Sequence, residues 1–378
     1  MLESPRWSTQ VRGEILERSA LPDVIPAWES LCARAAEDNV YYSPRYAQAL
    51  LGTVDAEREV RFAAAWAGSE LIGFLPFCAP KLHLPYLRRV GEAWIGPYTF
   101  SCMPLVDAAR GSDAASGLLD ALGAAGVSEW IIPFVNVRGA ACQAMLRALE
   151  RRGVASAFVG SFQRASLSAT HGFDEHMQHC VPARRRKELA RTRRRLEALG
   201  CVEHHVHHSG EGLSAAVEAF LQIETRGWKG ERRTAMACDA RSCEFARTVF
   251  NGSERDSICR ADVLTLDGTP IAVSLAVSAG STVFTVKCTY DESYRRFSPG
   301  LLLEIEIMRS FLNEGWAARL DAATAGSHVI DSLWPGRVEV ADLAFSLDPA
   351  AGQRRLANFQ LCDGWKRRVK ARVRDLIG

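Results

Sequence analysis

The sequence predicts a mixed α/β protein of the α+β class, with two domains of similar design. First, 378 residues exceed what one ordinary hydrophobic core organises. Second, a hairpin signature occurs twice, each time as two apolar runs around a polar turn with glycine. Third, a further strand, a helix and a last strand follow the hairpin in both halves. We therefore expect two domains, at 1–165 and 166–378, each with a twisted, mostly antiparallel sheet flanked by helices.

In the first half, the hairpin is predicted from two apolar runs that flank the polar turn 67–70. The expected elements are strands at 61–66 and 71–77, a strand region at 93–105, a helix at 112–123 and a strand at 129–135. Hairpins are common in mixed proteins, so a chance recurrence remains the alternative to a true repeat.

The second half repeats this order with a clearer pattern. The expected elements are strands at 261–266 and 271–277, a strand at 282–290, a helix at 301–313 and a strand at 318–321. Along the predicted helix, Leu301, Ile305, Met308 and Leu312 recur on one side, which predicts packing on the sheet. We therefore expect the chemistry in this half.

Composition narrows the function classes. The chain is 48% hydrophobic and 24% charged with a net charge of +2, so no global field points to nucleic acid or an anionic membrane. No apolar run is long enough to span a bilayer, and residues 1–10 lack the apolar core of a signal peptide. Eleven cysteines without a CxxC pair favour reduced thiols. These features predict a cytoplasmic protein.

The turn before the predicted helix at 301–313 has the features of an anion site. Ser298 is expected to cap the helix with its side-chain oxygen, Pro299 suits the first helical position, and Gly300 lets a ligand approach the backbone. Free N–H groups and the helix dipole favour phosphate, and two preceding arginines add donors. The residues predicted to bind a cofactor are Arg295, Arg296, Phe297, Ser298, Pro299, Gly300 and Leu301. An ordinary capped helix is the alternative.

Several runs in the second half resemble a group of double-domain proteins. The runs are 223–230, with 234–235 soon after, 287–292, 298–300 and 329–334. They are similar to the CelD/BcsL-like acetyltransferases associated with cellulose biosynthesis, which are related to the FemAB peptidoglycan transferases. The resemblance covers roughly residues 180–345 and implies tandem GNAT domains, the first one degenerate. It also implies acetyl-CoA or another acyl-CoA as donor and a role in exopolysaccharide biosynthesis.

An N-acyltransferase must deprotonate an amine, stabilise an oxyanion and protonate a thiolate. The candidate catalytic residues are Asp321, His328, Glu224 and Tyr290. Asp321 ends an apolar strand, His328 follows it, and Glu224 lies near the end of an amphipathic helix. A strand-end cap is the alternative role for Asp321, and Tyr294 is an alternative to Tyr290 as the acid.

Four residues near these groups are candidates for contact with the acceptor, which would be an amine of a sugar, a polymer precursor or a small metabolite. They are Trp228, Lys229, Lys287 and Asp331. Core packing is the alternative role for Trp228. Lys287 is expected on the face opposite Phe284, Val286 and Cys288, where a mid-strand lysine must reach water or a partner.

Residues 182–199 predict a helix with eight basic and two acidic side chains. It could contact RNA, an anionic lipid surface or an acidic polymer, or it could be a solvated connector. Because of this helix, a FemAB-like transferase that uses aminoacyl-tRNA is an alternative function. A non-catalytic partner in polysaccharide or lipid assembly is a third. A second added helix is predicted at 353–376. The histidines between His204 and His208 lack the ligand spacing of a zinc site, so no metal is expected.

Overall fold

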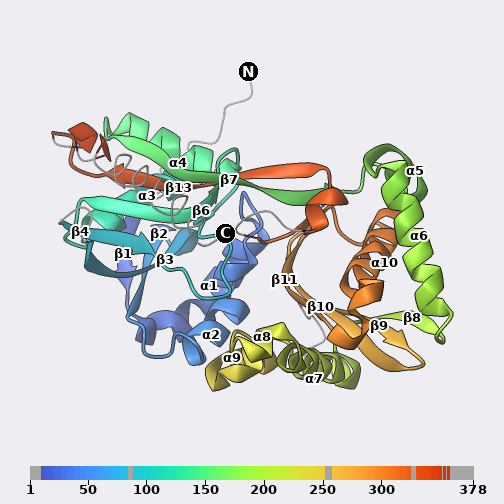
Figure 1. Cartoon of the computed structure of the whole chain (residues 1–378). Helices are drawn as coiled ribbons and strands as arrows, with labels where there is room; N and C mark the ends of the chain where they lie inside the picture. Colours follow the sequence, from blue (N-terminus) through green and yellow to red (C-terminus); the bar gives the residue numbers. More distant parts are fainter. Residues whose placement is uncertain are drawn as a thin grey trace, which may run out of the picture. The chain divides into compact units, whose positions relative to one another are not determined.

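The structure is a computed structural model that describes residues 10–83, 88–251, 258–324, 329–350, 352–354 and 356–357. The chain forms two compact units (Figure 1). Residues 45–56 and 163–338 make up the second unit, and the remainder make up the first. The first unit also takes residues from Glu339 onward. The division into two domains at 1–165 and 166–378 stays a prediction.

The first unit contains one sheet. Its strands, in spatial order, are β1 (Val11–Leu16), β2 (Val60–Ala67), β3 (Glu70–His83), β4 (Arg88–Ala93), β6 (Glu129–Asn136) and β13 (Gly336–Ser346, from Glu339). β4 and β6 are parallel and the other neighbours are antiparallel. Its helices are α1 (Leu21–Ala33), α3 (Gly111–Gly123) and α4 (Ala140–Arg151). The predicted hairpin, helix and last strand are confirmed.

The predicted strand region 93–105 is wrong. β4 ends at Ala93, and the following segment is irregular until β5, which contains only Leu105 and Val106. β5 pairs with β3. Gly96 and Pro97 interrupt the segment, and both residues disfavour a regular strand interior.

The second unit has the same strand order. Its strands are the end of β7 (Ser156–Ser168), then β12 (Arg319–Asp321), β11 (Thr282–Tyr290), β10 (Thr269–Ala279), β9 (Cys259–Leu266) and β8 (Val202–His207). β11 and β12 are parallel and the other neighbours are antiparallel. All five elements predicted for this half are confirmed.

Helices cover this sheet, with α7 on one face and α10 with α6 on the other (Figure 1). The α-helices are α2 (Pro44–Gly52), α5 (Phe173–Cys180), α6 (Ala183–Glu197), α7 (Gly210–Arg226), α8 (Trp228–Glu231), α9 (Ala240–Val249) and α10 (Pro299–Glu314). Among the described residues, the short 3-10 helices are η1 (Arg18–Ala20), η2 (Val40–Tyr42), η4 (Met236–Cys238), η5 (Glu292–Phe297) and η6 (Val329–Ser332). The basic helix predicted at 182–199 is α6, whereas most of the helix predicted at 353–376 lies outside the described residues.

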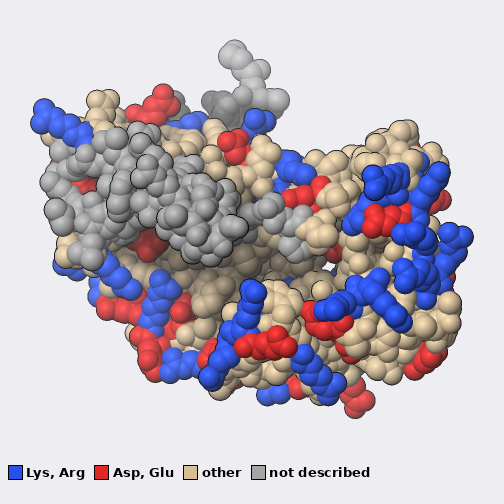
Figure 2. All heavy atoms as spheres, viewed as in Figure 1, with Lys and Arg blue, Asp and Glu red and all other residues tan. Residues whose placement is uncertain are grey.

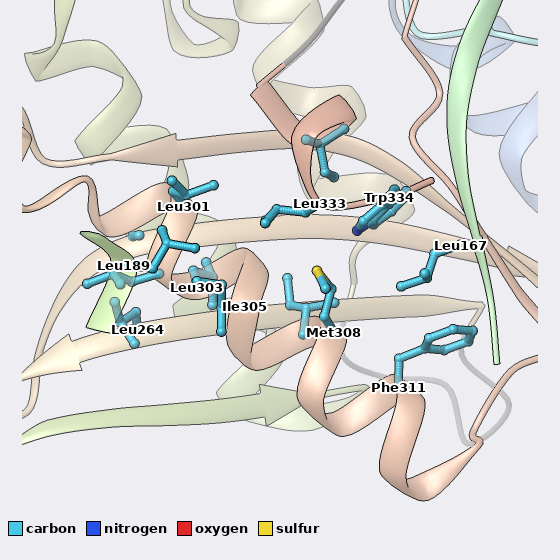
Figure 3. Close-up of a cluster of buried hydrophobic side chains, with 14 of the residues drawn as sticks. Leu167, Leu189, Leu264, Leu301, Leu303, Ile305, Met308, Phe311, Leu333 and Trp334 are labelled. Carbon is cyan, nitrogen blue, oxygen red and sulfur yellow. The ribbon is translucent and has the colours of Figure 1, made fainter. Parts of the chain in front are cut away.

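The core of the second unit forms where α10 meets the sheet. Met308 and Phe311 of α10 are fully buried and belong to one hydrophobic cluster with Leu264 of β9 and Trp334 (Figure 3). The predicted apolar face of this helix is confirmed, because Leu301, like Ile305 and Leu312, is at least nine-tenths buried. Within the described ranges, no helix is both long enough and apolar enough to cross a bilayer.

Candidate functional site

The parallel strands β11 and β12 pair over a short length and then part. Their three paired positions run from Thr282 with Arg319 to Phe284 with Asp321. β12 ends there, whereas β11 continues to Tyr290. Beyond Phe284, the β12 side of β11 therefore offers backbone groups that a bound ligand can pair with.

A β-bulge lies at the start of this opening. β10 pairs Leu275 with Lys287 and Ala276 with Thr285, so Val286 is an extra residue in β11. Thr285 lies beside residues of α10, yet Lys287 bonds to Glu224 of α7, on the other face. The prediction that Lys287 faces away from Phe284 and Val286 is therefore wrong, because the bulge breaks strict alternation. Bulges often re-aim side chains next to active sites.

Glu224 organises a cluster of charged groups on this face. Its Oε1 accepts hydrogen bonds from Lys287 Nζ at 2.7 Å and Lys229 Nζ at 3.1 Å, and its Oε2 accepts from the Met236 N–H at 2.8 Å. Lys229 also donates to the Cys288 carbonyl at 3.2 Å. The Glu224 side chain is fully buried, whereas the lysines keep 20% and 24% of their side chains exposed.

Burial lowers the pKa of Lys287, and the bond to Glu224 opposes that shift. One carboxylate thus holds two ammonium groups, one of which is partly deprived of water. Glu224, Lys229 and Lys287 were predicted separately as acid–base or acceptor-binding groups, and the structure brings all three together.

A small pocket of about 30 Å³ lies over this cluster. It is lined by Glu224, Gly227, Trp228, Lys229, Cys288, Thr289, Tyr290 and Glu292. Trp228 is 46% exposed, with the Arg232 guanidinium 5.3 Å from its ring centroid. Trp228 is therefore a wall of the pocket and is not a core residue, which leaves its predicted contact with an acceptor open.

Tyr290 lies where this pocket meets the start of α10. A Cβ placed on Gly300 would lie 3.4 Å from Cδ1 of Tyr290 and 3.8 Å from Sγ of Cys288, so the turn rests against the end of β11. Burial, followed by the carboxylate of Glu292, raises the pKa of Tyr290. The phenol therefore keeps its proton at neutral pH and can act as an acid.

The turn before α10 differs from the prediction in its cap. Ser298 has left-handed backbone angles (φ 47°, ψ 54°), and its side chain makes no capping bond. Its carbonyl instead accepts from the N–H groups of Leu301 at 3.0 Å and Leu302 at 3.1 Å. The predicted side-chain cap is wrong, and Leu301 is not a free donor. Because Pro299 has no N–H, Gly300 supplies the donor of this first turn.

Arginines surround the turn. Arg295 and Arg296 are exposed, and the Arg296 guanidinium lies 4.7 Å from the ring of the buried Phe297. Arg195 of α6 lies 5.6 Å from the same ring. Phe297 is thus a core residue whose ring contacts two guanidinium groups. Arg195 was not among the residues predicted for this site, which were 295–301.

Neither Asp321 nor Asp331 lines the pocket over Glu224. Asp321 is buried and forms a salt bridge with Arg164 Nε at 2.8 Å, and it accepts a hydrogen bond from the Ala323 N–H. These bonds commit its carboxylate to structure. Asp331 lies in η6, where its main-chain carbonyl accepts from Arg337. His328 lies outside the described residues.

His204 belongs to a buried ionic network. Asp262 accepts from Nε and Nη2 of Arg260 at 2.7 and 2.8 Å and lies 2.8 Å from His204 Nε2. The Arg260 guanidinium lies 3.8 Å from the ring centroid of Trp316. Across the described ranges, no three His, Cys, Asp or Glu side chains are grouped to hold a metal.

The chain resembles known proteins in part of its sequence and in its fold. Residues 183–328 match the family model of the acetyltransferase (GNAT) domain. FemX superposes with a TM-score of 0.56 at 14% identity, covering 86% of this chain and 97% of its own. The C-terminal domain of a putative lysylphosphatidylglycerol synthetase from Agrobacterium fabrum superposes with a TM-score of 0.55 at 13% identity, covering 90% and 95%. No curated protein matches the chain in sequence. Residues 183–328 therefore form an acetyltransferase domain of the GNAT fold.

Proposed function

We propose that this protein is a cytoplasmic N-acyltransferase that moves an acyl group from acetyl-CoA or another acyl-CoA to an amine. The observation that carries the proposal is the opening between β11 and β12, which leads from the Glu224 cluster to the N-terminus of α10. It offers a backbone edge for the donor, an anion site at one end and a charged pocket at the other. We place the protein in the CelD/BcsL-like group, with an amine of a sugar, polymer precursor or small metabolite as acceptor.

On the donor side, the amide-containing arm of coenzyme A would pair with the β12 side of β11. The pyrophosphate would accept from the Gly300 N–H, and Arg295, Arg296 and Arg195 lie close enough to the turn to add charge. The first turn of α10 carries no acidic residue that would repel it.

On the chemical side, the amine nitrogen attacks the thioester carbon, the new amide bond forms and the C–S bond breaks. Backbone N–H groups beside the bulge at Val286 would bind the oxyanion. The amine's proton would pass to the Glu224–Lys287 pair, and Tyr290 would protonate the leaving thiolate.

Ligand-dependent thermal stability tests the donor site. With free acetyl-CoA at about one hundred times its Kd, a specific site stabilises the wild type by about 2.7 kcal/mol. Gly300→Glu places a carboxylate at the phosphate position without requiring a left-handed backbone, and it should abolish the shift. Gly52→Glu, at an open position on α2, is the matched control. No shift of the wild type with acetyl-CoA, longer acyl-CoAs or coenzyme A would refute the proposal.

The basic helix α6 favours a second candidate, a transferase that takes its acyl group from aminoacyl-tRNA. Its eight basic residues against two acidic ones could bind RNA phosphates. This candidate predicts tRNA binding that weakens steeply with salt, together with no stabilisation by acyl-CoA. A non-catalytic partner predicts neither.

A further inference from the structure

A groove of about 530 Å³ lies among α5, α6 and α10 in the second unit. Each helix contributes one face, because the lining residues recur at intervals of three and four. They are Phe173 and Met177 of α5, Arg186, Leu189, Ala190, Arg193 and Arg194 of α6, and Leu302, Ile305, Glu306 and Arg309 of α10. The groove is distinct from the pocket at Glu224, which has no lining residue in common with it.

The floor of the groove is apolar. Phe173 and Leu189 are each 5% exposed, and Leu302 is 2% exposed, so their side chains form a deep surface. Ala190, by contrast, is exposed on α6 and leaves room above that floor. A ligand with an alkyl chain would displace water here and would bind more tightly as more methylenes are buried.

The rim is cationic, with four arginines against Glu306. Two of these arginines serve the fold. Arg186 donates to carbonyls at the end of α5, and Arg193 pairs with Glu197 and Glu306. Arg309 lies over the ring of Phe173 at 4.0 Å and also pairs with Glu306 at 3.4 Å, but its side chain stays about half exposed, and Arg194 is exposed. Figure 2 shows lysine and arginine side chains gathered over the part of this unit where α6 lies.

We propose that this groove binds an anionic lipid of a membrane surface, with its acyl chain on the apolar floor and its phosphate at Arg194 and Arg309. An apolar floor under a cationic rim complements an amphiphile with a negative headgroup, and the surplus basic residues of α6 complement the surrounding bilayer surface. RNA phosphates would use the arginines of the rim but would leave the apolar floor of the groove uncovered.

Two binding measurements test the proposal. Vesicles of phosphatidylcholine with phosphatidylglycerol should bind the wild type at about 0.1 M salt, whereas pure phosphatidylcholine vesicles should not. Arg194→Glu should weaken this binding roughly tenfold to thirtyfold. Arg191→Glu makes the same charge change on an exposed position of α6 outside the groove, and it should weaken binding less. Equal losses in both variants would overturn the groove as the site.

The apolar floor is tested with a soluble probe, dihexanoylphosphatidylglycerol below its micelle concentration, compared with glycerol phosphate. Only the lipid should bind, and Ala190→Trp, which fills the groove without changing charge, should abolish that binding. Ala183→Trp, on an exposed position at the start of α6, should retain it. Equal binding of the lipid and of glycerol phosphate would refute the proposal. So would binding of tRNA that is lost in Arg194→Glu, if the lipid does not bind. Circular dichroism checks that each variant is folded.

Discussion

Glu224→Gln tests the charge cluster at the candidate site. The substitution keeps the shape of the side chain but removes the negative charge that faces Lys229 and Lys287. Breaking a buried ion pair from one side typically costs about 3–5 kcal/mol. Both lysines are partly exposed, and glutamine can still accept the Met236 N–H bond, so we expect a smaller loss of about 2–3 kcal/mol in the free energy of unfolding.

The loss in the free energy of unfolding should also depend on pH. Burial holds the folded-state pKa of Lys287 below its usual 10.5, so the unfolded chain binds more protons in that window and stability rises with pH there. Without Glu224 the folded-state pKa falls further and the window widens. The variant should therefore recover part of its lost stability between about pH 7.5 and about pH 9.5, more than the wild type gains.

Urea unfolding at both pH values, followed by circular dichroism, measures these effects. Glu218→Gln is the matched control, because Glu218 lies on the same helix and pairs with Arg247 at 2.6 and 2.9 Å, with both side chains about half exposed. Such a pair contributes at most about 1 kcal/mol. If Glu224→Gln costs no more than Glu218→Gln, or if its loss does not shrink as the pH rises, the cluster is not a buried charge centre.

Three further outcomes are expected. Burial and the Asp262 carboxylate raise the pKa of Glu304 well above 4.5, so Glu304→Gln should be nearly neutral at low pH and should gain on the wild type by up to about 1.4 kcal/mol per pH unit as the pH rises, measured by urea unfolding. Asp321→Asn should cost about 3–5 kcal/mol in the same assay, because it removes the buried carboxylate that pairs with buried Arg164; a small loss with abolished turnover would instead identify Asp321 as the base. Tyr290→Phe should lower kcat by roughly a hundredfold or more while acyl-CoA still stabilises the protein. Unchanged turnover would remove Tyr290 from the chemistry.

Local patterns predicted the elements of the second unit well. The strand that ends at Tyr290 and the apolar face of α10 are signals within short windows, and both are confirmed. The predictions that failed concern features that depend on residues far apart in the sequence. The bulge at Val286 follows from register against β10, and the pairing of Glu224 with Lys287 joins residues 63 positions apart. Neither β7 nor β13, which complete the two sheets, was predicted.

In the candidate site too, local patterns predicted some features and missed those that depend on tertiary packing. The turn from Arg295 to Leu301 could be located from serine, proline and glycine, but its backbone cap and the nearby Arg195 depend on tertiary packing. Asp321 fitted every local criterion for a base, and only the position of Arg164 on β7 shows that its carboxylate is committed. Local patterns therefore say which residues are candidates, whereas their partners depend on tertiary packing.

The first unit explains why the second is the better place for a phosphate ligand. At the start of α3, Asp107 accepts from the N–H groups of Ala109 at 2.9 Å and Arg110 at 3.0 Å, and it pairs with Arg34. The Asp107 carboxylate therefore lies just before that helix, and Asp113 lies in its first turn, so both would repel a phosphate there. At α10 the corresponding turn has arginines before it and no acid within it.

The parallel strand pair of the first unit is closed in the same way. Gly91 of β4 faces Trp130 of β6 so closely that an added Cβ would lie 2.4 Å from the indole. Trp130 is fully buried and packs edge-on against Phe77, with ring centroids 5.4 Å apart. Core side chains therefore fill the junction that, in the second unit, opens beside Lys287. The same strand order supports a packed core in one unit and leaves a backbone edge for a ligand in the other.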